Sequence, residues 1–511
     1  MIVRHGRILR RPQIRAVIPP IRGDRTLPDS FDARMIAARL DRLPSSPALW
    51  AWITRLSVAG FFEVYETALT AVMAPALVAI GIFRAGEDGL FGLPDLASFG
   101  FATFAGLFLG ALIFSVLADR LGRRPIFTVS LLWYAAAGII MGLQTDPAAL
   151  CAWRFIAAIG MGAEVVAIDS YLSELTPKAM RGRGFAISKA MQFAGVPVAG
   201  ILALLLLHRT VMGIEGWRWM AFFPAIGAVL VWWLRRGLPE SPRWLAEHGR
   251  TREAIRILAA LEAKIQARTD RLFPDALPPA DNASPTPGRF SDLCRPPLLP
   301  RVLLMFVVSS SITIAYFGFG NWLPSILQAQ GADISKSLAY SAAIAIAFPV
   351  APLVFSLFAD KVERKWQIVA GAAVSVLGGL LFSVQHAAFG RIACALVITT
   401  ANNLAASATH TYRSELFPTS VRARAVGLIY ATDRMVAAGN SYIVGFVLIR
   451  FGVEGVMAFL VGASLLGIAA VALLGPRSNG LAAEEIGGAS PRTQSKPLAL
   501  SLRPAGGDKN D

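Results

Sequence analysis

The stretch that decides the fold is GALIFSVLADRLGRRP, at residues 110–125. In it an apolar run ends at Asp119, and Gly122 lets the chain turn tightly because glycine adopts left-handed backbone angles. The basic residues of the turn are Arg120, Arg123 and Arg124. A second apolar run follows at once. Because basic residues of short loops stay in the cytoplasm, the stretch predicts two membrane helices joined on the cytoplasmic side.

The rest of the chain repeats this alternation of apolar runs and short basic loops. Of its 511 residues, 55% are apolar and 16% are charged, whereas soluble proteins carry about a quarter charged residues. About 20 apolar residues cross a hydrocarbon core about 30 Å thick. Runs of that length predict twelve spans, at about residues 55–82, 98–118, 125–144, 149–173, 184–207, 217–236, 301–328, 337–358, 366–385, 389–412, 423–449 and 453–474. This pattern excludes a water-soluble enzyme.

The net charge of +16 is carried by residues that lie between the apolar runs. It therefore reflects membrane topology, and no nucleic-acid partner is expected. The basic loops place both termini in the cytoplasm and the protein in the cytoplasmic (inner) membrane, where the lipid bilayer surrounds it. The predicted segments are a basic tail (1–54), a six-helix bundle (55–237), a cytoplasmic loop with short helices (238–300), a second six-helix bundle (301–474) and a second cytoplasmic tail (475–511).

An internal repeat relates the two halves, with each match displaced by 241 residues, as from Arg123 to Arg364. The matched residues are Asp119, Arg123, Arg124, Tyr171, Glu174 and Arg181 in the first half, and Asp360, Arg364, Lys365, Tyr412, Glu415 and Arg422 in the second. Parallel repeats across a pseudo-twofold axis are typical of alternating-access carriers. We therefore predict an all-α integral membrane fold, with twelve transmembrane helices in two pseudo-symmetric six-helix bundles.

At these positions the chain resembles the major facilitator superfamily. Residues 110–125 resemble its signature between the second and third helices, and RFIAAIGMG (154–162) resembles its fourth-helix pattern. PESPR (239–243) and SELFPTSVRARAVG (414–427) resemble the signatures of sugar porters after helices six and ten. The resemblance covers residues 55–474 and implies a transporter of a small molecule rather than an enzyme. We expect it to be a monomer.

The charged turn and its repeat define what we call the rim cluster. Its residues are Asp119, Arg120, Gly122, Arg123, Arg124, Glu174 and Arg181, with Asp360, Arg364, Lys365, Glu415 and Arg422 in the second half. A network of individually weak ion pairs can lock two bundles together and release them when they rock, so we predict a cytoplasmic gate. Charges that only fix topology are the alternative. Because Glu363 replaces Gly122 in the second copy, we expect that copy to be weaker.

Charged residues near the bilayer centre cost about 2.5–3.5 kcal/mol each on insertion scales, and are therefore functional candidates. Glu63 and Glu66 lie three residues apart, on one face of the first helix. Two carboxylates this close can bind and release a proton, so we predict that they couple transport to protons, with Asp433 as a further candidate. The pair resembles the first-helix acids of aromatic-acid and nicotinate symporters, with Glu in place of Asp. A glutamate that only hydrogen-bonds a neighbouring helix is the alternative.

Arg434 is the best candidate for binding a substrate carboxylate, because a guanidinium offers two parallel donors that match carboxylate geometry. Its alternative role is an ion pair with its neighbour Asp433. The other predicted substrate contacts are Glu164, Gln192, Tyr316, Asn402 and Asn403. Each of the four uncharged residues alone is more often a helix-packing hydrogen bond.

The sequence therefore predicts a proton-coupled secondary transporter of a small organic solute that bears a carboxylate. It contains no ATP-binding lysine motif, and its cysteines, Cys151, Cys294 and Cys394, have no metal-binding spacing, so no cofactor or metal is expected. A sugar or polyol transporter is the first alternative, supported by PESPR at residues 239–243. A nontransporting membrane sensor is the second.

Overall fold

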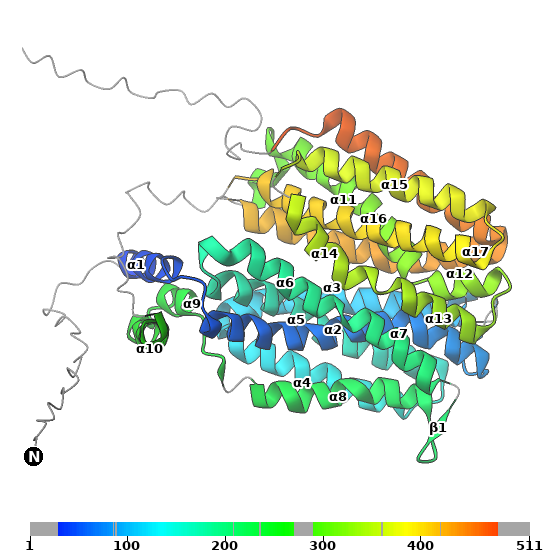
Figure 1. Ribbon diagram of the computed structural model, residues 1–511, viewed down its shortest axis with the longest axis horizontal. Coiled ribbons are helices and arrows are strands. Elements are labelled where there is room, and N and C mark those ends of the chain that lie inside the picture. Colours follow the sequence, from blue (N-terminus) through cyan, green and yellow to red (C-terminus); the bar gives the residue numbers. More distant parts are fainter. Residues whose placement is uncertain are drawn as a thin grey trace, which may run out of the picture.

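The computed structural model describes residues 29–478 except 85, 87, 88, 93, 208, 235–236, 270–289, 359–360 and 419–420. Asp360, the chain before residue 29 and the chain after residue 478 therefore lie outside the described residues, as does part of the central loop. The described chain is helical apart from one two-stranded hairpin and its connecting turns (Figure 1).

The first half contains a short leading helix and six spans. Its elements are α1 (Asp29–Asp41), α2 (Pro47–Ala79), α3 (Asp95–Leu121), α4 (Arg123–Gly142), α5 (Pro147–Leu175), α6 (Arg181–Phe193), α7 (Gly195–Leu206), β1 (Thr210–Val211), β2 (Ile214–Glu215) and α8 (Gly216–Leu234). Helices α6 and α7 form one span, and the two strands pair antiparallel.

The central loop and the second half contain the remaining helices. They are α9 (Pro242–Glu247), α10 (Thr251–Thr269), α11 (Leu298–Gly320), α12 (Leu323–Ala329), α13 (Ile334–Ile344), α14 (Ala347–Phe358), α15 (Arg364–Val384), α16 (Ala388–Glu415) and α17 (Arg422–Leu474). Helices α13 and α14 form one span. Helix α17 bends at Gly452, where φ is 65° and ψ is −164°, and so crosses twice.

By length and composition, eleven helical segments of the described chain could cross a membrane. Because α17 supplies two spans, all twelve predicted spans are present. The helices of each half pack against one another, and the two bundles lie side by side, with α3 against α17 and α6 against α14 (Figure 1). The predicted all-α membrane fold is confirmed.

Two span boundaries differ from the prediction. The first span begins at Pro47 rather than near residue 55, because the Ser46 side chain caps the helix and proline fits its first turn. The seventh span ends at Gly320, and the short helix α12 follows it. Pro324 in the first turn of α12 accounts for this break, because proline lacks the N–H that a continuous helix would need there.

Helix α1 occupies a stretch that was predicted to belong to the N-terminal tail. Its buried side chains Ile36 and Leu40 face the core, and it packs on α9 and α10. Arg39 and Arg42 both bind the Glu262 carboxylate of α10, at 2.6 and 2.9 Å. The alternation of apolar and basic residues in α1 thus builds a docked helix rather than a solvated tail.

The two ends of the molecule differ in charge. We call the end with α1, α9, α10 and the rim cluster the basic end, and the end with the β1–β2 hairpin and α12 the opposite end. They lie at the left and right of Figure 1.

At the opposite end the bundles are joined by small residues. A Cβ at Gly100 of α3 would lie 2.8 Å from the Ser441 hydroxyl of α17, and one at Gly200 of α7 would lie 3.0 Å from the Cβ of Ala342 in α13. The hydroxyl of Tyr442 also lies 3.4 Å from that of Ser98. Here the backbones of the two bundles approach closely, as small residues permit.

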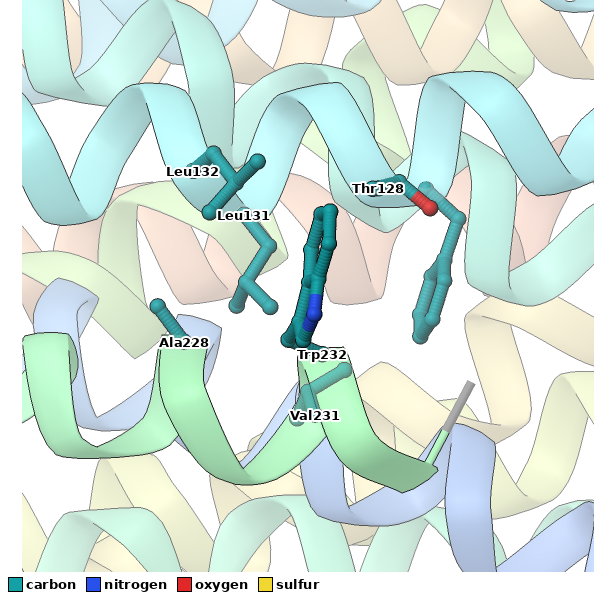
Figure 2. A pocket seen from close by; sticks show the side chains of 7 residues that line it. Thr128, Leu131, Leu132, Ala228, Val231 and Trp232 are labelled. Atoms are coloured by element: carbon teal, nitrogen blue, oxygen red, sulfur yellow. The ribbon is translucent and has the colours of Figure 1, made fainter. Parts of the chain in front are cut away.

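A crevice between α4 and α8 is a packing feature rather than a candidate site. Figure 2 shows Trp232 of α8 projecting toward α4, between Leu131 and Thr128. Its lining is apolar apart from Thr128, and it holds no water-sized space. None of the predicted site residues lines it.

We predict that Gly200→Leu prevents full closure of the opposite end, because a leucine cannot fit against Ala342. Cysteine labels placed at the opposite end of α7 and α13 should become more accessible, and distances measured between spin labels there should lengthen. Gly462→Leu is the matched control, since a Cβ at Gly462 meets no heavy atom within 4 Å. Equal labelling of both variants would contradict close packing at Gly200.

Candidate functional site

Ionisable side chains gather midway between the two ends, on helices of both bundles. Glu66 of α2 and Arg154 of α5 form the most buried pair, with both side chains 0% exposed and 2.6 Å between Nη1 and Oε2. Arg154 also donates to the hydroxyls of Thr70 and Thr103, at 3.0 and 2.9 Å. This network fixes α2, α3 and α5 relative to one another.

Glu63 lies one helical turn from Glu66 but meets different partners. The Thr67 hydroxyl donates to its carboxylate at 3.2 Å. Lys189 of α6 and Arg434 of α17 both act on its charge. The two glutamates that were predicted to act as a pair thus have different partners: Glu66 is held by Arg154, and Glu63 lies among Thr67 and Lys189 of its own bundle and Arg434 of the other.

Lys189 was not among the predicted site residues. Its ammonium group binds Asp169 of α5 at 2.8 Å and the side-chain oxygen of Gln192 at 3.3 Å. Gln192 packs against Gly60 of α2, where a Cβ would lie 2.6 Å from its Cγ. The available signal was a lysine inside a predicted span together with an acid in the preceding span.

Arg434 lies at the interface of the two bundles. Its guanidinium donates to the Tyr430 hydroxyl and lies over the rings of Tyr430 and Phe317, at 4.7 and 5.6 Å from their centroids. Phe317 in turn contacts Phe104 of the first bundle, with ring centroids 4.6 Å apart. Among the described residues, no carboxylate forms a salt bridge with Arg434.

Asp433 pairs with Arg413 of α16 rather than with its neighbour Arg434. Arg413 binds the Asp433 carboxylate at 2.8 Å and the Ser309 hydroxyl at 3.1 Å. Adjacent helical positions point about 100° apart, which explains why Asp433 and Arg434 do not pair. The alternative role of Arg434, an internal ion pair with Asp433, is therefore wrong. Arg413 lies just beyond the predicted tenth span and was not predicted as a site residue.

The remaining predicted substrate contacts fall in different places. The Tyr316 hydroxyl lies 3.4 Å from the side-chain oxygen of Asn403, and Tyr316 interacts with both Arg434 and Glu63. Asn402 instead donates to the carbonyl of Ala315 and lines a cavity of about 10 Å³ inside the second bundle, the size of one water site. The structure thus brings Tyr316 and Asn403 to the charged centre and turns Asn402 away from it.

Glu164 of α5 is fully buried, and both of its carboxylate oxygens lack a hydrogen-bonded partner among the described residues. Its electrostatic neighbours are Glu63 and the Tyr134 hydroxyl of α4. The charged group that acts on Glu164 is therefore the acid Glu63 rather than a basic side chain.

At the rim cluster both halves use the same geometry. Arg123 binds Glu174 at 3.0 Å, and the matched Arg364 binds Glu415 at 3.1 Å. Arg123 also binds Asp119 at 2.6 Å. Each of these three ion pairs connects residues of one bundle, so in this conformation they do not join the two bundles.

The other rim residues mostly bind backbone groups or lie at the surface, and Arg181 also forms a salt bridge with Asp41 at 3.7 Å. Arg181 and Arg422 each donate to a backbone carbonyl five residues earlier, and Lys365 donates to the carbonyl of Gly475. Arg120 is exposed. These contacts, too, remain within single halves of the chain.

Comparison with known proteins decides the family. The sequence profile described as "Sugar (and other) transporter" matches residues 53–489. The chain belongs to this transporter family. It is 27% identical over 443 residues to the putative metabolite transport protein YyaJ of Bacillus subtilis (strain 168), covering 87% of this chain and 96% of that protein.

Two further comparisons agree with this assignment. The transporter is 23% identical over 453 residues to the niacin transporter NiaP of Acinetobacter baylyi, covering 88% of this chain and 99% of that protein. The solved xylose transporter XylE from E. coli, in a partially occluded inward-open conformation, superposes with a TM-score of 0.66 at 17% identity, covering 85% of this chain and all of that one. The chain and that structure therefore share one fold, the major facilitator fold.

The transporter's central loop completes the rim through Glu240, which was not predicted as a site residue. Its carboxylate accepts the backbone N–H groups of Arg123 and Arg124, both at 3.2 Å, and so caps the N-terminus of α4. A Cβ at Gly122, where φ is 98°, would lie 2.6 Å from this carboxylate. Burial raises the pKa of Glu240, while the N–H groups that it accepts act in the opposite direction.

In the second half a different carboxylate, on the turn itself, makes the contacts near the rim. Glu363 occupies the position of Gly122 and accepts the backbone N–H of Ser478 at 2.8 Å, while the Ser478 hydroxyl donates to Glu415 at 2.6 Å. The replacement of glycine by Glu363 thus comes with its own contacts to the chain that follows α17.

We predict that Glu240→Ala destabilises the protein by about 1 kcal/mol, because the first N–H groups of α4 lose their acceptor. Glu240→Gln should cost less, since the amide oxygen still accepts one of them. Thermal unfolding of the purified protein measures both. Glu253→Ala, which removes an acid that pairs with Arg250 on α10, is the control and should leave the melting temperature unchanged. Equal melting temperatures for Glu240→Ala and wild type would contradict the capping role.

Proposed function

We propose that this protein is a proton-coupled secondary transporter that moves a small organic solute bearing one carboxylate across the cytoplasmic membrane. The observation that carries this proposal is Arg434, a guanidinium held at the bundle interface without a salt bridge among the described residues. Because no carboxylate of the described residues binds this guanidinium directly, a substrate carboxylate could accept two parallel hydrogen bonds from it.

The surroundings of Arg434 suit such a ligand. Phe317 offers apolar contact for the body of the solute, and Tyr316 and Asn403 offer hydrogen bonds on the side of the second bundle. Gln192 offers an amide on the side of the first bundle. Contacts from both bundles let substrate binding bias the rocking equilibrium between them.

The conformation supports alternating access. The bundles are packed together at the opposite end, through Gly100 and Gly200, while the rim ion pairs remain within single bundles. We propose that the basic end is cytoplasmic, since basic loops remain there. This form is then the inward-facing one, in line with the conformation named for the xylose transporter XylE. One chain contains the whole interface, so a monomer suffices.

A sugar or polyol is the second candidate substrate. It is favoured by the uncharged hydrogen-bonding groups of Gln192, Tyr316 and Asn403 around the same centre, and by the resemblance in fold to XylE. A sugar lacks the planar carboxylate that accepts two parallel hydrogen bonds from Arg434, which is why we place it second.

Transport by the purified protein in proteoliposomes tests the proposal. Labelled nicotinate, benzoate, gluconate and xylose should be offered in parallel with an inward proton gradient. We expect a monocarboxylate to accumulate, and a protonophore to abolish the accumulation. Accumulation of xylose alone would favour the sugar candidate, and absence of flux for every solute would contradict a transporter of these classes.

We predict that Arg434→Lys weakens binding of the transported monocarboxylate about tenfold or more. Lysine keeps the charge but loses the planar fork, and a hydrogen bond to a charged group contributes about 1.5–3 kcal/mol. Ligand-induced thermal stabilisation measures the change. Arg450→Lys, an exposed arginine on the same helix, is the control and should bind as wild type does. Wild-type affinity in Arg434→Lys would show that the guanidinium does not hold the substrate.

A further inference from the structure

The buried charges between the two ends do not balance. Among the described residues, five carboxylates and four permanent cations lie in this middle region, deeper than the rim cluster. The acids are Glu63, Glu66, Glu164, Asp169 and Asp433, and the cations are Arg154, Lys189, Arg413 and Arg434. One negative charge is in excess.

Three ion pairs account for six of these groups. Glu66 binds Arg154 at 2.6 Å, Asp169 binds Lys189 at 2.8 Å, and Asp433 binds Arg413 at 2.8 Å. Each pair is neutral and lies within one bundle. Glu63, Glu164 and Arg434 remain, so two carboxylates share one guanidinium.

Glu63 and Glu164 belong together in space. The charge of Glu63 acts on Glu164, and Tyr134 of α4 interacts with both. The Glu164 side chain is 0% exposed, and its carboxylate oxygens lack a hydrogen-bonded partner among the described residues. A carboxylate so buried and without a hydrogen-bonded partner is costly to ionise, and a charge on Glu63 opposes its ionisation further.

The ionisable and hydroxyl groups that act on this pair come from six helices. They are Thr67 on α2, Tyr134 on α4, Asp169 on α5, Lys189 on α6, Tyr316 on α11 and Arg434 on α17. Lys189 and Asp169 neutralise each other, and the hydroxyl groups carry no charge. His410 on α16 lies near Lys189, Arg413 and Arg434, and we count it as neutral. Arg434 is then the charge that the pair must balance.

We propose that Glu63 and Glu164 act as one proton-binding pair that holds one proton in the empty transporter and two in the loaded one. This inference rests on the proposed function. With one proton, the pair carries one negative charge and balances Arg434. When a monocarboxylate binds Arg434, a second proton restores neutrality. Each substrate therefore crosses with one proton, and no net charge moves.

The same charge balance predicts which classes of substrate can cross together with a proton. A neutral sugar leaves the charge unchanged and takes up no proton at this pair. A dicarboxylate brings two charges, but the pair can accept only one further proton. The charge balance therefore favours monocarboxylates.

Infrared difference spectroscopy on the purified, substrate-free protein tests the retained proton. The wild type should show a carboxylic-acid C=O band at neutral pH, because one of the two glutamates is protonated. Both Glu63→Gln and Glu164→Gln should lose this band, since the remaining carboxylate balances Arg434 without a proton. Glu454→Gln, at an exposed acid, is the control and should retain it. A band that persists in both variants overturns the proposal.

Transport by the double variant tests the carried proton. The assay uses proteoliposomes and the monocarboxylate identified in the transport screen, with nicotinate as the first probe. Uptake by the wild type should be driven by the proton gradient and should not change when a membrane potential is imposed. Each single variant should still accumulate substrate, because either glutamate can take the carried proton, but with a shifted pH dependence. Glu63→Gln/Glu164→Gln should exchange substrate without accumulating it along a proton gradient, and its uptake should respond to membrane potential.

Two results of the transport assays would contradict the proposed proton-binding pair. If the double variant still accumulates substrate, another acid, such as Glu66, must carry the proton. Complete loss of accumulation in Glu63→Gln alone, with accumulation unchanged in Glu164→Gln, assigns the proton to Glu63 by itself. If the wild type transports none of the solutes, the proposed function fails, while the infrared measurement still decides whether the pair holds a proton.

Discussion

A charge in the bilayer interior must be compensated where it stands, and this constraint organises the middle of the protein. Removing one partner of a buried ion pair typically costs about 3–5 kcal/mol, so Glu66–Arg154 and Asp433–Arg413 fix the helices that carry them, while the more exposed Asp169–Lys189 pair contributes less. Glu66–Arg154 joins α2 to α5, Asp169–Lys189 joins α5 to α6, and Asp433–Arg413 joins α16 to α17. All three lie within a single bundle. They make each bundle rigid and leave the interface between bundles free of such ties, which is what rocking motion needs.

The fold could be predicted from the sequence because its signals are long and redundant. The apolar runs are each long enough to span, and the offset of 241 residues places Arg123 and Arg364 in equivalent positions, where they make matching bonds to Glu174 and Glu415. The errors were local. The first span begins earlier because Ser46 caps α2, and α1 is a docked helix whose apolar residues are too few to stand out beside a membrane span.

The charged centre could be predicted only in part, because pairing depends on helix rotation and crossing. Sequence spacing puts Glu63 and Glu66 on one face, but one turn of helix is enough for Glu66 to pair with Arg154 while Glu63 lies between Lys189 and Arg434. Lys189 was missed because one lysine hardly changes the hydropathy of an otherwise apolar run. Its place in the charged centre depends on its ion pair with Asp169, which lies 20 residues earlier in the chain. No periodicity within one helix encodes such a contact.

The two halves close their basic ends with chain that follows their own sixth span. In the first half the Tyr171 hydroxyl binds the carbonyl of Pro239, just after α8, and Glu240 caps α4. In the second half the Tyr412 hydroxyl binds the carbonyl of Pro476, just after α17. Among the described residues, each bundle is thus fastened at this end by contacts from its own half of the chain. During synthesis on the ribosome, the first bundle can be sealed as soon as its sixth helix and the next few residues have emerged, before any of the second bundle exists.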